Sequence, residues 1–268
     1  MTTEHPPNGP AAADQAPADQ APATRAPAAQ QSADQEPVDQ EPTGPAAAEP
    51  PDGPVVYWDV PVFFHSLGLE LSEEEREAHL AEVAQEIWSG GTDFQRETVA
   101  SWYREIARDA AEAGALYSGF LLGVLDDGRL STGSLVIQSA QADTQDAEAA
   151  AAAIEELLSG DPANEVFTVD APVGPVVVSA YGTINEFDDG EGNKAKLELA
   201  EAIAYIPVPQ VDTLLTMTVS TPILKEFPDY MAALATVVES VVLVRPGEQR
   251  TAPVLSQGSA SRITEMFG

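Results

Sequence analysis

The chain has 268 residues, 44% of them hydrophobic, and carries 44 acidic against 12 basic residues for a formal net charge of -32. Such an anionic surface repels nucleic-acid phosphates and anionic lipid heads, so the composition argues against nucleic-acid and membrane binding and favours basic partners. The absence of cysteine excludes disulfides, thiolate catalysis and cysteine-ligated metals. Since we find neither a secretory signal nor an apolar run of roughly 20 residues, we expect a cytoplasmic protein.

Residues 1–54 consist largely of Pro, Ala, Gln, Asp and Glu and contain no Trp, Tyr, Phe, Leu or Ile. A segment with so little to bury cannot offset the entropy of ordering its backbone, so we predict a disordered arm. The motif ADQAP occurs twice and is followed by ADQEP and VDQEP. The arm is therefore interpreted as a solubilising spacer, with a docking tag as the alternative.

The composition changes at Val55, where VVYWDVPVFFHSLGL predicts an extended segment interrupted at Pro61. Ser72 and Glu75 form a capping-box pattern that begins a helix running to Trp88. Its predicted inward face is Leu80, Val83, Ala84, Ile87 and Trp88. A second helix is expected to begin near Thr92 or Asp93 and to end at Gly114. Its predicted inward face is Val99, Trp102, Tyr103, Ile106 and Ala110.

A β-hairpin is predicted next, because LYSGFLLGVL and LSTGSLVIQ flank the turn Asp126-Asp127-Gly128-Arg129. An alanine-rich helix follows over 144–159, with Ile154, Leu157 and Leu158 expected to face inward. VFTVDA predicts a strand, and a further strand pair is expected over 176–187 and 196–208. Ala200, Ala202 and Ala204 lie on one face of the second strand of that pair, which favours close approach of a helix.

The segment 214–242 predicts a strand, a turn and an amphipathic helix that folds back on the sheet. Apolar and hydroxyl side chains alternate along LLTMTVST, and Thr221-Pro222 ends the strand. Pro228 suits the first turn of the helix, where its missing N–H costs little. VVLV is expected to add a short last strand.

The run TMTVSTPILKEFPDYMAALATVVESVVL resembles the C-terminal signature of PsbP-like α/β/α sandwich proteins, including the LpqN-type actinobacterial group. The signature positions are Ser220, Thr221, Pro222, Tyr230 and Ser240. We therefore expect an α+β domain over 55–246, with an antiparallel sheet of six to seven strands and flanking helices, followed by a flexible tail over 247–268. The resemblance implies protein binding and brings no catalytic residues. The chain departs from the family in its missing lipid-attachment cysteine and its two helices ahead of the hairpin.

Candidate catalytic and metal-binding residues are few. His65, Asp59 and a serine are the components of a nucleophilic triad, but no G-x-S-x-G elbow exposes a serine. The acidic loop that contains Asp188, Asp189 and Glu191 offers oxygen ligands to Ca²⁺, although it does not match the twelve-residue calcium loop. A solvated hairpin turn is the simpler interpretation of that loop. We expect no cofactor.

Four aromatic residues, Tyr57, Trp58, Phe63 and Phe64, are concentrated in one short run, which makes this run the first candidate for a partner-binding surface. The sequence therefore predicts a non-enzymatic protein-binding or adaptor protein with an unidentified protein partner. An accessory role in specialised secretion follows from the resemblance alone. The alternatives are a hydrolase that uses carboxylates or His65, and a calcium-binding module.

Overall fold

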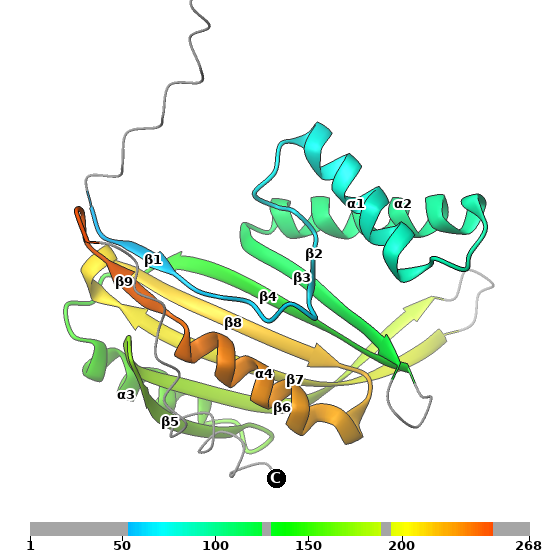
Figure 1. The fold of residues 1–268 in the computed structure, drawn as a ribbon. Helices are drawn as coiled ribbons and strands as arrows, with labels where there is room; N and C mark the ends of the chain where they lie inside the picture. Colours follow the sequence, from blue (N-terminus) through cyan, green and yellow to red (C-terminus); the bar gives the residue numbers. More distant parts are fainter. Residues whose placement is uncertain (1–52, 125–129, 189–193, 249–268) are drawn as a thin grey trace, which may run out of the picture. The chain divides into compact units, whose positions relative to one another are not determined.

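A seven-stranded antiparallel sheet in the order β2-β3-β4-β8-β7-β6-β5 forms the centre of the structure (Figure 1). The computed structural model describes residues 53–124, 130–188 and 194–248. The strands are β2 His65–Ser66, β3 Ala115–Val124, β4 Leu130–Gln141, β5 Glu165–Ala171, β6 Gly174–Asp188, β7 Lys194–Val208 and β8 Thr213–Thr221. The α+β fold and the strand pairs predicted from sequence are confirmed. Most of the predicted arm over 1–54 and the whole Asp126–Arg129 turn lie outside the described residues.

The predicted last strand forms, but it does not join the large sheet. It is β9, Val242–Val244, and it pairs antiparallel with β1, Val55–Tyr57, as a separate two-stranded sheet. The start and the end of the described chain are therefore held together. All described residues fall within one compact unit. The domain limits at 55 and 246 stay predictions, as does the flexible tail over 247–268, most of which lies outside the described residues.

Four helices are present among the described residues: α1 Glu73–Ile87, α2 Asp93–Glu112, α3 Ala147–Leu158 and α4 Phe227–Glu239. The capping box of Ser72 and Glu75 is confirmed, because the Ser72 hydroxyl accepts from the Glu75 N–H while the Glu75 carboxylate accepts from the Ser72 N–H. Thr92 and Gln95 form a second capping box at α2, which extends the same pattern. Gly114 follows α2 with a φ of 75°, the left-handed conformation that favours glycine after a helix.

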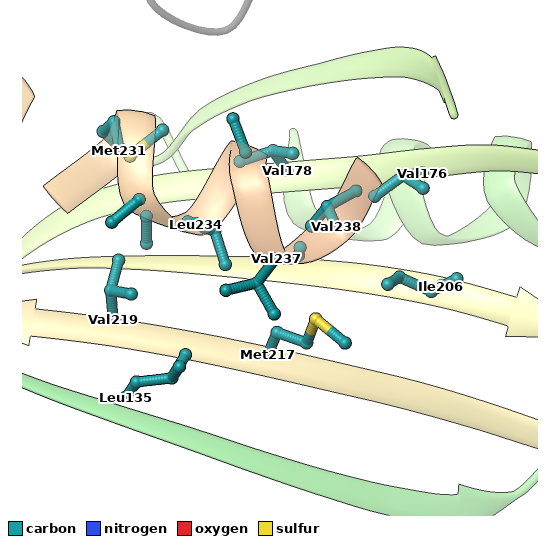
Figure 2. Close-up of a cluster of buried hydrophobic side chains, with 14 of the residues drawn as sticks. Leu135, Val176, Val178, Ile206, Met217, Val219, Met231, Leu234, Val237 and Val238 are labelled. Atoms are coloured by element: carbon teal, nitrogen blue, oxygen red, sulfur yellow. The ribbon is translucent and has the colours of Figure 1, made fainter. Parts of the chain in front are cut away.

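One face of the sheet is covered by α4. Its Met231, Leu234, Val237 and Val238 meet strand residues in the main core, as Figure 2 shows. Ala202 and Ala204 of β7 are fully buried in this core, which confirms that the alanine face of β7 accepts a helix. The larger strand side chains of the core include Leu135, Ile137, Val176, Val178, Ile206, Leu215, Met217 and Val219.

The opposite face is covered at its two ends by different helices. Val177 alternates with the core residues Val176 and Val178, so it points away from α4. Its partner in β5 is Thr168, whose hydroxyl binds the Glu155 carboxylate of α3. Phe120 of β3 also points away from α4, and it packs in a second core cluster with α1 and α2. The structure therefore has three layers. α4 covers one face of the sheet, and α3 and the α1–α2 pair cover the two ends of the other face.

The buried faces of α2 and α3 agree with the prediction only in part, since Val99 is buried and Tyr103 packs against the core but the larger predicted side chains do not. Trp102 and Ile106 are 59% and 51% exposed, whereas Ala107 is fully buried. Small Ala100 and Ala107 let α1 and β3 approach α2 closely, so the buried face is rotated away from the larger side chains. In α3, Leu157 is 78% exposed and Ala151 is the buried residue. Trp88, at the end of α1, is also exposed rather than core.

Candidate functional site

A cavity of about 490 Å³ opens at the β2–β3 edge of the sheet, beside the N-terminal end of α4. The apolar residues that line it are Val62, Phe63, Leu121, Leu122, Gly123 and Ala233. The polar residues that line it are His65, Glu86, Ser131, Glu226, Asp229 and Tyr230. The cavity thus combines side chains that lie far apart in the sequence, and its lining includes His65 and three carboxylic acids.

Tyr230 anchors the first turn of α4 to the sheet beside this cavity. Pro228 lies in the first turn of the helix, as predicted, and Tyr230 follows it. The ring is 4% exposed, and its hydroxyl lies 3.0 Å from Ser131 Oγ of β4. Burial raises the pKa of Tyr230, because the phenolate would lose its hydration there. Tyr230 therefore acts as a neutral, hydrogen-bonded packing residue at neutral pH.

The Ser220-Thr221-Pro222 turn sets the direction in which the chain leaves β8 towards α4. Thr221 Oγ1 donates to the Thr132 carbonyl at 2.7 Å and accepts from the Ile223 N–H at 3.0 Å. Ser220 Oγ lies 2.8 Å from Ser134 Oγ of β4. Both hydroxyls are occupied by contacts within the fold, so Ser220 and Thr221 have structural roles.

Ser240 fixes the opposite end of α4. Its hydroxyl accepts from the Asp59 N–H at 2.8 Å and lies 2.6 Å from the Val237 carbonyl. Asp59 is therefore held at the C-terminal end of a 13-residue helix, whereas the cavity with His65 lies at its N-terminal end. At about 1.5 Å per residue, the two ends are roughly 20 Å apart. The triad of His65, Asp59 and a serine is not assembled.

His65 belongs to the edge strand β2 and lines the cavity from there. Its ring lies tilted against that of Phe120, with centroids 5.6 Å apart. Glu226 and Asp229 are three residues apart at the start of α4, and Glu86 comes from the last turn of α1. His79 lies elsewhere, with Nε2 2.8 Å from the Ser66 carbonyl. Sequence reasoning missed Glu226 and Asp229; their only signal was their position beside the helix-starting Pro228.

The aromatic run does not form one surface. Phe64 is 6% exposed and belongs to the main core, and Trp58 packs against the same core. Tyr57 is partly exposed on β1, away from the cavity lining. Phe63 is 48% exposed at the cavity, and its neighbour Val62 is 99% exposed. Of the four predicted residues, Phe63 alone combines exposure with a place in the cavity.

Of the three predicted calcium ligands, only Asp188 lies within the described residues. Asp188 is the last residue of β6, and Asp189 and Glu191 lie outside the described residues. Among the residues that the structure does describe, no group of three or more His, Asp or Glu side chains is placed to hold a metal ion. The calcium alternative stays a prediction.

The fold and the cavity together define an α+β protein with an acid-rimmed apolar cavity at the edge of an antiparallel sheet. Neither a known protein family nor a characterised protein matches the sequence. The solved structure of LpqN from Mycobacterium tuberculosis, described as involved in cell envelope biogenesis, aligns with 74% of this chain and 87% of that chain. The identity is 11% and the TM-score is 0.32, so this distant likeness carries no argument about function. None of the helices in the described ranges is long and apolar enough to cross a membrane.

Proposed function

We propose that this chain is a non-enzymatic binding protein whose cavity takes a basic and apolar segment of a partner protein. The observation that carries the proposal is the exposure of Val62 and Phe63 at the cavity, at 99% and 48%. Exposed neighbouring apolar side chains remain hydrated until a partner covers them, and their burial then favours binding. A catalytic site for acid–base chemistry would not require exposed apolar side chains such as those of Val62 and Phe63.

Charge defines the kind of partner. The described lining of the cavity contains Glu86, Glu226 and Asp229 but no Lys or Arg side chain. The whole chain adds a formal net charge of -32, which attracts cations from a distance and repels acidic partners. Complementary charges increase the rate and the specificity of association. A segment with Lys or Arg among apolar residues therefore fits the cavity.

An array of unbiased nonamer peptides tests this function. Incubation with the full chain should enrich peptides that combine Lys or Arg with apolar residues. Binding of these peptides in solution should weaken by about tenfold or more in Phe63→Ser. It should also weaken as salt rises from about 0.05 to 0.3 M, because added ions screen the carboxylates.

The matched control is Phe94→Ser, which removes an aromatic side chain that is 80% exposed on α2 and does not line the cavity. Binding should be unchanged in this variant. An array without enrichment for basic peptides, or enriched peptides whose binding is insensitive to Phe63→Ser, would reject the proposed function.

A carboxylate-dependent hydrolase is the second candidate, favoured by the presence of His65, Glu226 and Asp229 in the lining of one cavity. Turnover of model glycosides, esters or peptides that disappears in Glu226→Gln or Asp229→Asn would establish it. A lack of turnover over such a panel, together with peptide binding, would favour the non-enzymatic function. The cytoplasmic location and the accessory role in specialised secretion stay predictions.

A further inference from the structure

The β2–β3 edge of the sheet is covered by a partner strand along only part of its length. β2 pairs with β3 at His65 with Phe120 and at Ser66 with Gly119. β3 continues to Val124, but within the described ranges no strand pairs with it beyond Phe120 on that side. Leu121, Leu122 and Gly123, which follow this point, line the cavity.

A turn in the chain leaves this edge open. The Phe64 N–H donates to the Pro61 carbonyl at 3.0 Å, so the segment before β2 turns instead of continuing along β3. Pro61 itself has no N–H with which to pair. Val62 and Phe63, which would otherwise extend β2, line the cavity instead.

The direction of the open backbone groups follows from the strand geometry. The Leu67 N–H donates to the Ser118 carbonyl at 2.8 Å, so Ser118 directs its backbone groups towards β2. Alternate residues of a strand direct their N–H and C=O to the same side. Leu122, four residues further on, therefore directs both groups to the open edge. Leu121 and Gly123 direct theirs towards β4.

The carboxylates lie on both sides of this edge. Asp229 belongs to α4, which covers one face of the sheet, and Glu226 immediately precedes this helix. Glu86 belongs to α1, which packs with Phe120 on the opposite face. Side chains of an added strand would alternate between the two faces of the sheet. Of two adjacent basic residues, one would therefore face the α4 side with Asp229, and the other would face the α1 side with Glu86.

We infer that the open edge of β3 at Leu122 captures the partner segment as an added β-strand with two adjacent basic residues. This inference rests on the proposed function and specifies its mode: backbone pairing with Leu122 holds the segment, and the exposed carboxylates of Glu86 and Asp229 select its charge. Apolar side chains of the segment cover Phe63. Strand addition to a sheet edge is a general mode of peptide recognition, in which the main chain supplies affinity and the side chains supply specificity.

The test uses the full chain and a capped nonamer with adjacent Arg and Lys at its centre and alternating Val and Thr on each side. Backbone N-methylation is scanned along the nonamer, and binding is measured by calorimetry. Methylation at every second position of the central residues should weaken binding about tenfold or more, because those N–H groups pair with β3. Methylation at the intervening positions should weaken it less than about threefold.

Amide hydrogen exchange provides an independent measurement. The Leu122 amide should be unprotected in the chain alone and should become protected when the nonamer binds. The Leu121 amide is the internal control, because it faces β4 and should be protected in both states. Protection of the Leu122 amide in the chain alone would show that another part of the chain occupies the edge, which would overturn the inference.

The two proposals fail differently. Binding that is lost in Phe63→Ser but shows no alternation in the N-methyl scan would overturn strand addition while leaving the proposed function standing. A peptide in which one residue separates the Arg from the Lys should bind more weakly than the nonamer in which they are adjacent. Tighter binding of the separated peptide would also overturn the inference. The absence of any binding that depends on Phe63 would reject both.

Discussion

Gly133 of β4 leaves open the space that the ring of Tyr230 occupies at the start of α4. A Cβ atom at Gly133 would lie 2.6 Å from Tyr230 Cζ and 2.8 Å from the Ser220 carbonyl oxygen. Both distances are shorter than any normal contact of a Cβ atom. The close approach of helix and strand beside the cavity therefore depends on the missing side chain of one glycine.

Gly133→Ala should reduce the free energy of unfolding by about 1–3 kcal/mol, because the added methyl group must displace the Tyr230 ring and the β8 backbone. Urea denaturation measures this loss. The matched control is Gly123→Ala on the neighbouring strand, where the new Cβ would meet Leu121 Cδ2 at 3.9 Å, an ordinary contact. Equal stability losses in the two variants would contradict the steric explanation.

Ser240→Ala should reduce the free energy of unfolding by about 1 kcal/mol, because the Asp59 N–H loses its acceptor. The amide of Asp59 should also exchange its hydrogen faster, and residues 53–60 should become more sensitive to protease. Thr236→Val is the control, since the Thr236 hydroxyl donates to the Ala232 carbonyl within α4 itself. The prediction is wrong if both variants expose residues 53–60 equally.

Alkaline pH should destabilise the protein through tyrosines that are partly or fully buried. Burial, with a smaller contribution from the charge of Glu70, raises the pKa of Tyr117 to about 12, whereas an unfolded chain has a tyrosine pKa of about 10. The unfolded state therefore loses this proton first. The stabilisation is complete below about pH 10 and is lost as the pH rises through about 12.

Urea denaturation between about pH 8 and 12 should record this loss, and Tyr117→Phe should reduce its slope. Phenolate absorbance of the folded protein should likewise develop above the ordinary pH range, because burial also raises the pKa values of Tyr103, Tyr181, Tyr205 and Tyr230. Stability that is independent of pH over this range would contradict the assignment.

The two faces of α2 should differ in how strongly substitution destabilises the protein. Trp102→Gln should change the free energy of unfolding by less than about 0.5 kcal/mol, because its side chain is 59% exposed. Ala107→Leu should cost about 1–3 kcal/mol, because Ala107 is fully buried between α1 and β3. Thermal or urea denaturation checks both. A larger loss of stability for Trp102→Gln than for Ala107→Leu would show that the face of α2 with Trp102, as predicted from the sequence, is the buried one.

The sequence alone predicted the features that depend on residues close together in the chain. Ser72 and Glu75 form their capping box within one helical turn, and Pro228 begins α4 because its ring suits the first turn. The alternation along 214–221 predicted β8, and the alanines of β7 predicted a close helix. Such signals suffice because their physical causes, backbone conformation and local hydrogen bonding, act between near neighbours.

The tertiary structure decided which of two adjacent faces of a helix is buried, because periodicity gives the spacing of apolar residues but not the partner they meet. Small Ala107 rather than large Trp102 faces the core, since the approach of α1 and β3 leaves room for no more. Long-range pairing likewise placed β9 against β1. It also assembled Phe63, Leu122 and Asp229 around one cavity, because contacts between distant segments depend on the whole packed chain.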